Sequence, residues 1–207
     1  MNKKVNIIVD STADITEDVK ERLTVVPLTL RFGDEEYIEG VTIQKKEFYQ
    51  KLIESDVLPK TSQAVPADFS DIFEKIAAAG ESAVVITLSS KLSGTWQSAM
   101  IAAREHEESI YVVDSRNVAI GTAILAKLAL RLVDEGMGAR EIAERLEKER
   151  EKICLIAMLD TLEYLKKGGR ISAAAAFAGG VLSIKPVVCI RDGEIVILGK
   201  ARGSKQG

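Results

Sequence analysis

The chain has 207 residues, of which 46% are hydrophobic and 29% are charged, with only 4 prolines and 15 glycines. This composition excludes the disordered, collagen-like and low-complexity classes, and it predicts one large globular domain or two small ones. The formal net charge of −3 and the aromatic content of 5% give no indication of nucleic acid or of an anionic membrane surface as a partner.

Individual segments predict a soluble, cytoplasmic protein. The N-terminal residues lead directly into a strand-like run, without a signal peptide's features, and no segment reaches the roughly 20 apolar residues that span a bilayer. Cys154 and Cys189 lie in apolar runs, so we expect both to be buried free thiols. His106 lies among charged residues; we expect it on the surface, and it cannot anchor a zinc site alone. We expect neither a metal nor a cofactor.

The first 152 residues alternate between strand and helix patterns. Val5–Val9 is a continuous apolar run followed by polar residues, which is typical of a buried parallel strand. Further strands are expected at 24–32, 35–41, 83–88 and 110–113, helices from 16 and at 45–55, 67–79, 94–106, 119–135 and 139–152, and a loop at 59–66. Such alternation predicts βαβ units and a parallel sheet, so the fold class is α/β.

Polar residues follow three of these expected strands. They are Asp10-Ser11-Thr12, Ser89-Ser90 and Asp114-Ser115. Ligands of open α/β sheets bind beyond the carboxyl ends of the strands. The three polar segments therefore predict a ligand site at one edge of the sheet.

The pattern changes after Lys152, where we place a domain boundary between an N-terminal α/β domain (1–152) and part of a second, smaller α/β domain (153–207). The second part is expected to hold a strand at 153–159, a short helix at 162–167, an Ala-rich helix at 172–178 and a hairpin of strands 186–190 and 194–198. Asp192-Gly193 favours the positive φ of such a hairpin turn. A piece of about 55 residues buries little core by itself, so it must either pack on the first domain or lack some of its partner elements.

The segment Ser89–Thr95 joins a buried strand to a helix that starts near Gly94. Ser93 is expected to cap that helix, and hydroxyls, first-turn N–H groups and the helix dipole together favour an anion. An ordinary N-cap with a solvated loop explains the same spacing. Thr61-Ser62 forms a second hydroxyl pair, which a simple Ser/Thr turn also explains.

Known catalytic templates do not fit the chain. It has no nucleophile elbow, no dinucleotide fingerprint and no P-loop, since Gly193–Gly199 has five residues between its glycines and Ala201 follows Lys200. Hydroxyls near glycine with few general bases favour binding an anion over cleaving a bond. A hydrolase or phosphotransferase that uses Asp10, Asp114 and the Ser89–Thr95 loop is the alternative, and a regulatory interaction module is the third hypothesis.

Six segments, in order along the chain, resemble the DegV family. They are Asp10-Ser11-Thr12-Ala13-Asp14, Lys60-Thr61-Ser62-Gln63, Leu88-Ser89-Ser90-Lys91-Leu92-Ser93-Gly94-Thr95, Leu165-Lys166-Lys167-Gly168-Gly169-Arg170-Ile171, Ile184-Lys185-Pro186 and Gly199-Lys200-Ala201-Arg202-Gly203-Ser204-Lys205. The resemblance implies a two-domain α/β protein that binds one long-chain fatty acid in a tunnel between its domains. It also implies a carrier that presents the carboxylate to a fatty acid kinase subunit and performs no chemistry itself.

The resemblance also implies roles for single residues. The carboxylate site would consist of Thr61, Ser62, Ser93, Gly94 and Thr95, with Arg170 either adding charge or bracing the loop. Arg202 would face the kinase. The tunnel would be lined by Ile171, Phe177, Val181, Leu182 and Ile184, although an Ala-rich helix packed as core explains this region equally well.

The physical chemistry of a fatty acid agrees with these roles. Burying each methylene is worth about 0.8 kcal/mol, so a C16 chain has on the order of 10 kcal/mol available. Neutral hydroxyls and N–H groups supply the hydrogen bonds that a buried carboxylate needs. Family members continue for roughly a further quarter of their length, with a His that helps to hold the carboxylate. We therefore expect a shortened second domain with an open sheet edge.

Overall fold

The computed structural model describes residues 3–55, 57–171 and 184–202. Its centre is a four-stranded sheet in the order β2-β1-β6-β7, formed by β1 (Val5–Asp10), β2 (Leu23–Val26), β6 (Ser82–Thr87) and β7 (Ile110–Asp114). All three pairings are parallel, which confirms the predicted α/β fold with a parallel sheet. Every residue of β6 is buried, as expected for a central parallel strand covered on both faces.

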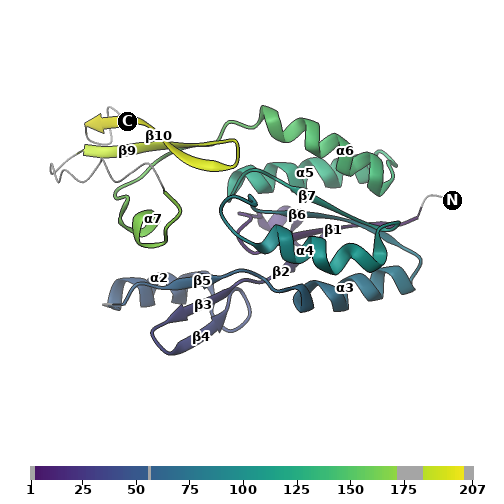
Figure 1. The fold of residues 1–207 in the computed structure, drawn as a ribbon, viewed down its shortest axis with the longest axis horizontal. Helices are drawn as coiled ribbons and strands as arrows, with labels where there is room; N and C mark the ends of the chain where they lie inside the picture. The colour runs from purple at the N-terminus through teal and green to yellow at the C-terminus, as the bar shows by residue number, and fades with distance from the viewer. Residues whose placement is uncertain (1–2, 56, 172–183, 203–207) are drawn as a thin grey trace.

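Helices cover both faces of this sheet (Figure 1). Their bounds are α1 (Glu17–Lys20), α3 (Pro66–Ala78), α4 (Thr95–Ala103), α5 (Ile120–Asp134) and α6 (Ala139–Glu149), with short 3₁₀ helices η1 (Arg104–His106) and η2 (Arg150–Lys152). Successive strand residues point to opposite faces, and so they feed two cores. Val9 packs with Leu125 of α5 and Leu146 of α6, whereas Ile8 packs with Phe69 and the rest of the α3–α4 layer.

A small antiparallel sheet, which we call the N-terminal small sheet, has the order β4-β3-β5. Its strands are β3 (Thr29–Phe32), β4 (Glu35–Ile38) and β5 (Lys60–Ser62), and α2 (Lys45–Glu54) accompanies them. The single strand expected at 24–32 is wrong, because the chain leaves the parallel sheet at Pro27, which has no N–H for a ladder. The loop expected at 59–66 is also wrong in part, since three exposed residues of it pair with β3 as β5.

The remaining antiparallel sheet, the C-terminal sheet, has the order β10-β9-β8. Its strands are β8 (Ile156–Met158), β9 (Ile184–Arg191) and β10 (Glu194–Arg202), and α7 (Glu163–Lys167) follows β8. The predicted hairpin is present and longer than expected, with positive φ at Asp192 (51°) and Gly193 (82°). The expected Ala-rich helix at 172–178 lies outside the described residues.

Both small sheets lie beyond the carboxyl ends of the parallel strands (Figure 1). Both small sheets therefore lie at the same edge of the parallel sheet as the three polar segments that follow its strands.

Cys189 is buried, but Cys154 is exposed, contrary to expectation, because burial alternates along 152–160 and an unbroken apolar run does not reveal which side faces out. In the described part of the chain, no helix has the length and apolar character needed to cross a membrane.

Candidate functional site

Asp10 ties the ends of two parallel strands together. Its carboxylate accepts hydrogen bonds from the N–H of Leu88 at 2.6 Å and from the N–H and hydroxyl of Thr12 at 3.0 and 2.5 Å. The side chain is fully buried, and burial raises its pKa while the hydrogen bonds from Thr12 and Leu88 oppose that shift. Asp10 thus joins the end of β1 to the start of the Ser89–Thr95 loop, and its oxygens are engaged in that task.

Asp114 holds the same loop from the next strand. Its Oδ2 accepts the hydroxyl proton of Ser90 at 2.5 Å, and its Oδ1 accepts the N–H groups of Ser90 at 3.2 Å and Arg116 at 2.9 Å. The carboxylates that the enzyme hypothesis requires therefore both bind main-chain and hydroxyl groups of adjacent loops.

The start of α4 gathers hydroxyl and N–H groups. The helix begins at Thr95 and its N-cap residue is Gly94, so the expected cap by Ser93 is wrong by one position. Ser93 Oγ instead accepts the N–H of Thr95 at 3.3 Å and lies 3.0 Å from the Thr95 hydroxyl. Thr95 is fully buried and Ser93 is half-buried. The helix geometry leaves the next N–H groups, those of Trp96 and Gln97, without an intrahelical acceptor.

Gln63 brings the second hydroxyl pair to this helix start. A Cβ on Gly94 would lie 2.0 Å from Gln63 Oε1, and Gln63 Nε2 donates to Ser98 Oγ at 3.1 Å. Thr61 and Ser62, which immediately precede Gln63, are exposed on β5. The absence of a Cβ at Gly94 therefore lets the end of β5 approach α4. Gln63 belongs to the Lys60–Gln63 motif, where its place directly after the hydroxyl pair is the one sequence signal for this contact.

Arg170 contacts the loop through its guanidinium group. Its Nε donates to the carbonyl oxygen of Leu92 at 3.1 Å, and its Nη1 donates to that of Gly168. These contacts correspond to the bracing role, while a direct role toward a ligand stays a prediction. Ile171, next to it, is buried with 8% of its surface exposed.

The other predicted lining and partner residues lie near or beyond the limits of the described chain. Phe177, Val181 and Leu182 are outside the described residues. Ile184 is the first residue of β9 and pairs in register with Arg202, the last residue of β10, which is exposed.

Two further contacts at this edge escaped sequence reasoning. Ser11 Oγ donates to Glu39 Oε2 at 2.6 Å and accepts the N–H of Leu28 at 2.9 Å, which ties the end of β1 to the N-terminal small sheet. Burial raises the pKa of Glu39, the Ser11 hydrogen bond lowers it, and the nearby charge of Asp10 raises it further. Ser11 lies in a polar segment that the sequence pattern marks, whereas Glu39 has no recognisable spacing signal.

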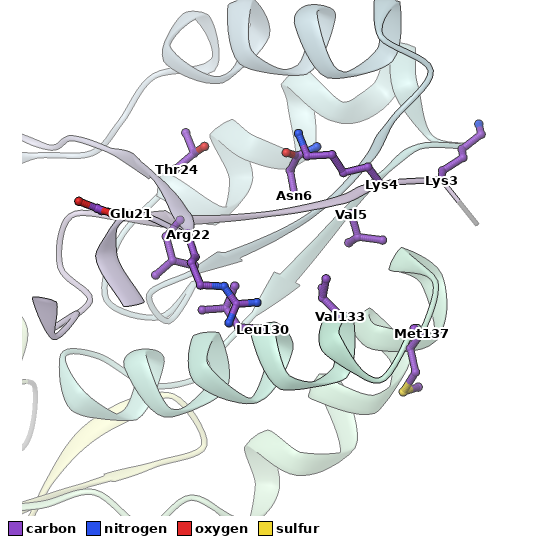
Figure 2. A pocket seen from close by; sticks show the side chains of 12 residues that line it. Lys3, Lys4, Val5, Asn6, Glu21, Arg22, Thr24, Leu130, Val133 and Met137 are labelled. Atoms are coloured by element: carbon purple, nitrogen blue, oxygen red, sulfur yellow. The ribbon is translucent and has the colours of Figure 1, made fainter. Parts of the chain in front are cut away.

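A hollow of about 540 Å³ lies at the opposite end of the parallel sheet, between β1, β2 and the end of α5 (Figure 2). Two of its three cationic side chains form ion pairs, Arg22 with Asp134 at 2.6 Å and Lys4 with Glu81 at 3.3 Å. It contains none of the predicted site residues. Among the described residues, no group of His, Cys, Asp and Glu is arranged to hold a metal.

Comparison with known proteins identifies the family. Residues 4–207 match the family described as "Uncharacterised protein, DegV family". The chain belongs to the DegV family. A DegV domain-containing protein of Caldanaerobacter subterraneus is 38% identical over 207 residues, which is 99% of this chain and 74% of the relative. A Clostridium perfringens DegV domain-containing protein is 34% identical, over 98% of this chain and 74% of its own.

Solved DegV structures share the fold. A fatty-acid-binding DegV family protein from Thermus thermophilus superposes with a TM-score of 0.88 at 33% identity, over 99% of this chain and 73% of its own. A DegV family protein from Ruminococcus gnavus, solved with vaccenic acid, gives 0.87 at 28% identity, over 99% and 74%. DegV from Bacillus subtilis, described as a fatty acid binding protein, gives 0.85 at 30% identity, over 98% and 73%.

Proposed function

We propose that this protein binds one long-chain fatty acid and holds its carboxylate at the start of α4. The observation that carries the proposal is the meeting of Ser93, Gly94 and Thr95 with the Thr61-Ser62 pair through the Gln63–Gly94 contact. The fatty acids bound by solved DegV proteins of the same fold support this choice of ligand.

The chemistry of the start of α4 suits a carboxylate. Hydroxyls and N–H groups at a helix start donate to an anion, and the helix dipole favours negative charge there. The carboxylates of Asp10 and Asp114, on which the enzyme alternative depends, both accept hydrogen bonds from the loops around them. Such a site stabilises the anion without attacking it, which supports a non-catalytic carrier over the hydrolase or phosphotransferase alternative.

The acyl chain, in this proposal, runs between an N-terminal domain (1–152) and a second domain (153–207). Buried Ile171 contributes to its lining, together with Phe177, Val181, Leu182 and Ile184. Burial of a C16 chain makes on the order of 10 kcal/mol of binding free energy available, which is more than the hydrogen bonds to the carboxylate provide. The acyl chain therefore supplies most of the affinity, and the hydroxyls orient the carboxylate.

The carrier presents the carboxylate to a fatty acid kinase subunit in the cytoplasm. Exposed Arg202, at the end of β10, is the proposed contact with that partner. Replacing Arg202 with Glu should lower the rate of fatty acid phosphorylation by the kinase while leaving fatty acid affinity unchanged. An unchanged phosphorylation rate would remove Arg202 from the partner surface.

Extraction of the purified protein followed by mass spectrometry tests the binding function. Recovery of a stoichiometric C14–C18 fatty acid supports the carrier. Turnover of acyl or phosphoryl esters that disappears in Asp10→Ala would instead support the enzyme. If delipidated protein takes up no palmitate in a titration, the proposal is wrong.

A further inference from the structure

The turn of the β9–β10 hairpin sits directly on the Ser89–Thr95 loop. Ser89 is fully buried, and its hydroxyl donates to the carbonyl oxygen of Gly193 at 2.7 Å. Ser89 Oγ also accepts a hydrogen bond from the N–H of Lys91 at 3.2 Å. A Cβ on Gly193 would lie 2.5 Å from Ser89 Oγ and 3.7 Å from the Cα of Arg116, so the turn touches the loop closely. A single hydroxyl therefore binds the hairpin and shapes the loop.

This contact lies a few residues before Ser93, Gly94 and Thr95, the residues proposed to bind the fatty acid carboxylate. Arg170 adds a second tie three residues further along, through the carbonyl oxygen of Leu92. Ser93, Gly94 and Thr95 follow Leu92 without interruption. Because the loop is held at both Ser89 and Leu92 by residues that follow α6 in sequence, its conformation depends on how those residues are docked.

We infer that Ser89 is a positioning residue that couples the β9–β10 hairpin to the carboxylate site. Docking of the hairpin orders the loop, and a ligand on the loop stabilises the docked hairpin. Coupling between two binding events is reciprocal, so the factor by which docking improves ligand affinity equals the factor by which ligand improves docking. The ligand part of this inference rests on the proposed function; the link between hairpin and loop does not.

Ser90 offers a matched control. It is the neighbouring serine of the same loop, and its hydroxyl also makes a short hydrogen bond, to Asp114 Oδ2 at 2.5 Å. Asp114 belongs to β7, so this bond stays within the parallel-sheet part of the molecule. Ser89→Ala and Ser90→Ala remove equal groups from adjacent positions, but only the first removes a contact with the hairpin.

Hydrogen–deuterium exchange of the ligand-free protein tests the link. We expect Ser89→Ala to raise exchange both in loop 89–95 and in β9–β10, and Ser90→Ala to raise it in the loop alone. Unfolding in denaturant, measured on the same samples, separates these local changes from loss of global stability. If Ser89→Ala leaves the hairpin at the wild-type exchange rate, or if Ser90→Ala loosens it equally, the link is refuted.

Palmitate titration tests the ligand part. We expect Ser89→Ala to bind palmitate about fivefold more weakly, as for loss of one ordering hydrogen bond. Saturating palmitate should slow hairpin exchange in the wild type and in Ser90→Ala but not in Ser89→Ala. Palmitate that binds the wild type without slowing hairpin exchange overturns the coupling and leaves the proposed function intact. A wild type that binds no palmitate overturns the function, while exchange without ligand still decides the link.

Discussion

Single side chains at the edge of the parallel sheet act mainly by holding loops in place. Asp10 and Asp114 bind N–H and hydroxyl groups of the loops, and Gln63 fills the space that a side chain at position 94 would occupy. The sequence located this edge because polar residues follow apolar strands. The sequence did not reveal the contacts of Gln63 with Gly94 or of Glu39 with Ser11. These partners lie 31 and 28 residues apart, and no local spacing encodes such a contact.

Removal of one head-group hydroxyl tests the site. Ser93→Ala and Thr61→Ala should each weaken fatty acid binding by about 1 to 3 kcal/mol, because a buried carboxylate loses a donor. Ser70→Ala serves as control, since that hydroxyl bonds the carbonyl oxygen of Pro66 within α3. Titration with a fluorescent fatty acid measures the effect. Unchanged affinity in both site variants would exclude these residues from the site.

Gly94→Ala is predicted to displace the end of the Gln63 side chain. A Cβ there would lie 2.0 Å from Gln63 Oε1, so the amide must move and give up its hydrogen bond to Ser98, at a cost of about 1 kcal/mol in unfolding free energy. Gly138 is the N-cap of α6 and has the same φ of −76°, but a Cβ there meets Glu141 Oε2 only at 3.6 Å. Gly138→Ala should therefore be milder in chemical denaturation; an equal loss in both variants would contradict the close-contact explanation.

Glu39 should make stability depend on pH. The pKa of Glu39 is raised in the folded state, so folding favours its neutral form. Its contribution to the free energy of unfolding is therefore fully present below the ordinary pKa of 4.5 and is lost as pH rises through the folded-state pKa. Glu39→Gln keeps an acceptor for Ser11 and removes the charge. We expect the variant to gain unfolding free energy relative to the wild type between pH 4 and pH 7, measured in urea. A difference that is constant with pH would show that Glu39 titrates alike in both states.

Elements with a complete apolar pattern were the predictable part of the fold. The central strands and the α3, α5 and α6 helices appear close to their expected bounds, because burial on a known period leaves a readable pattern. β5 was not predictable, since its three residues are exposed and it exists only through backbone pairing with β3. The hairpin turn was predicted by Asp192-Gly193, but not its docking on Ser89, which joins residues 104 positions apart.

Substitutions at two hairpin glycines distinguish the cost of backbone strain in a turn from the cost of disturbing the docked hairpin. Gly33 and Gly193 both have positive φ, at 59° and 82°, but an added Cβ meets nothing within 4 Å at Gly33 and meets Ser89 Oγ at Gly193. Gly33→Ala should cost about 1 to 2 kcal/mol from backbone strain alone. Gly193→Ala should cost about 1 to 3 kcal/mol more, because either the docked turn must move or the Ser89 side chain must rotate and lose its hydrogen bond to the hairpin. Equal melting shifts in the two variants would show that docking adds nothing.

At the scale of the whole molecule, the C-terminal sheet leaves apolar side chains of β8 exposed. Ile156 is 58% exposed and Met158 is 39% exposed, both on β8, and within the described residues β8 pairs only with β9. An apolar strand with an unpaired edge is a template for association.

We expect the protein to self-associate through β8. Ile156→Lys should shift the protein toward monomer in size-exclusion chromatography with light scattering, since an edge lysine opposes strand addition. Ile53→Lys is the control, because Ile53 is 83% exposed but lies on α2. A wild type that is monomeric at all concentrations, or an equal effect of both substitutions, would contradict association at this edge.

The strand order also has a consequence for folding during synthesis on the ribosome. β1 precedes its neighbours in the parallel sheet along the chain, yet its place between β2 and β6 is complete only when Ser82 can pair with Val5, 77 residues later. At a synthesis rate of about 5 to 20 residues per second, the apolar side chains of Ile7 and Ile8 wait roughly 4 to 15 seconds for that neighbour. During this interval the apolar side chains of β1 lack their β6 neighbours, so we expect this segment to be a binding site for a ribosome-associated chaperone until β6 is synthesised.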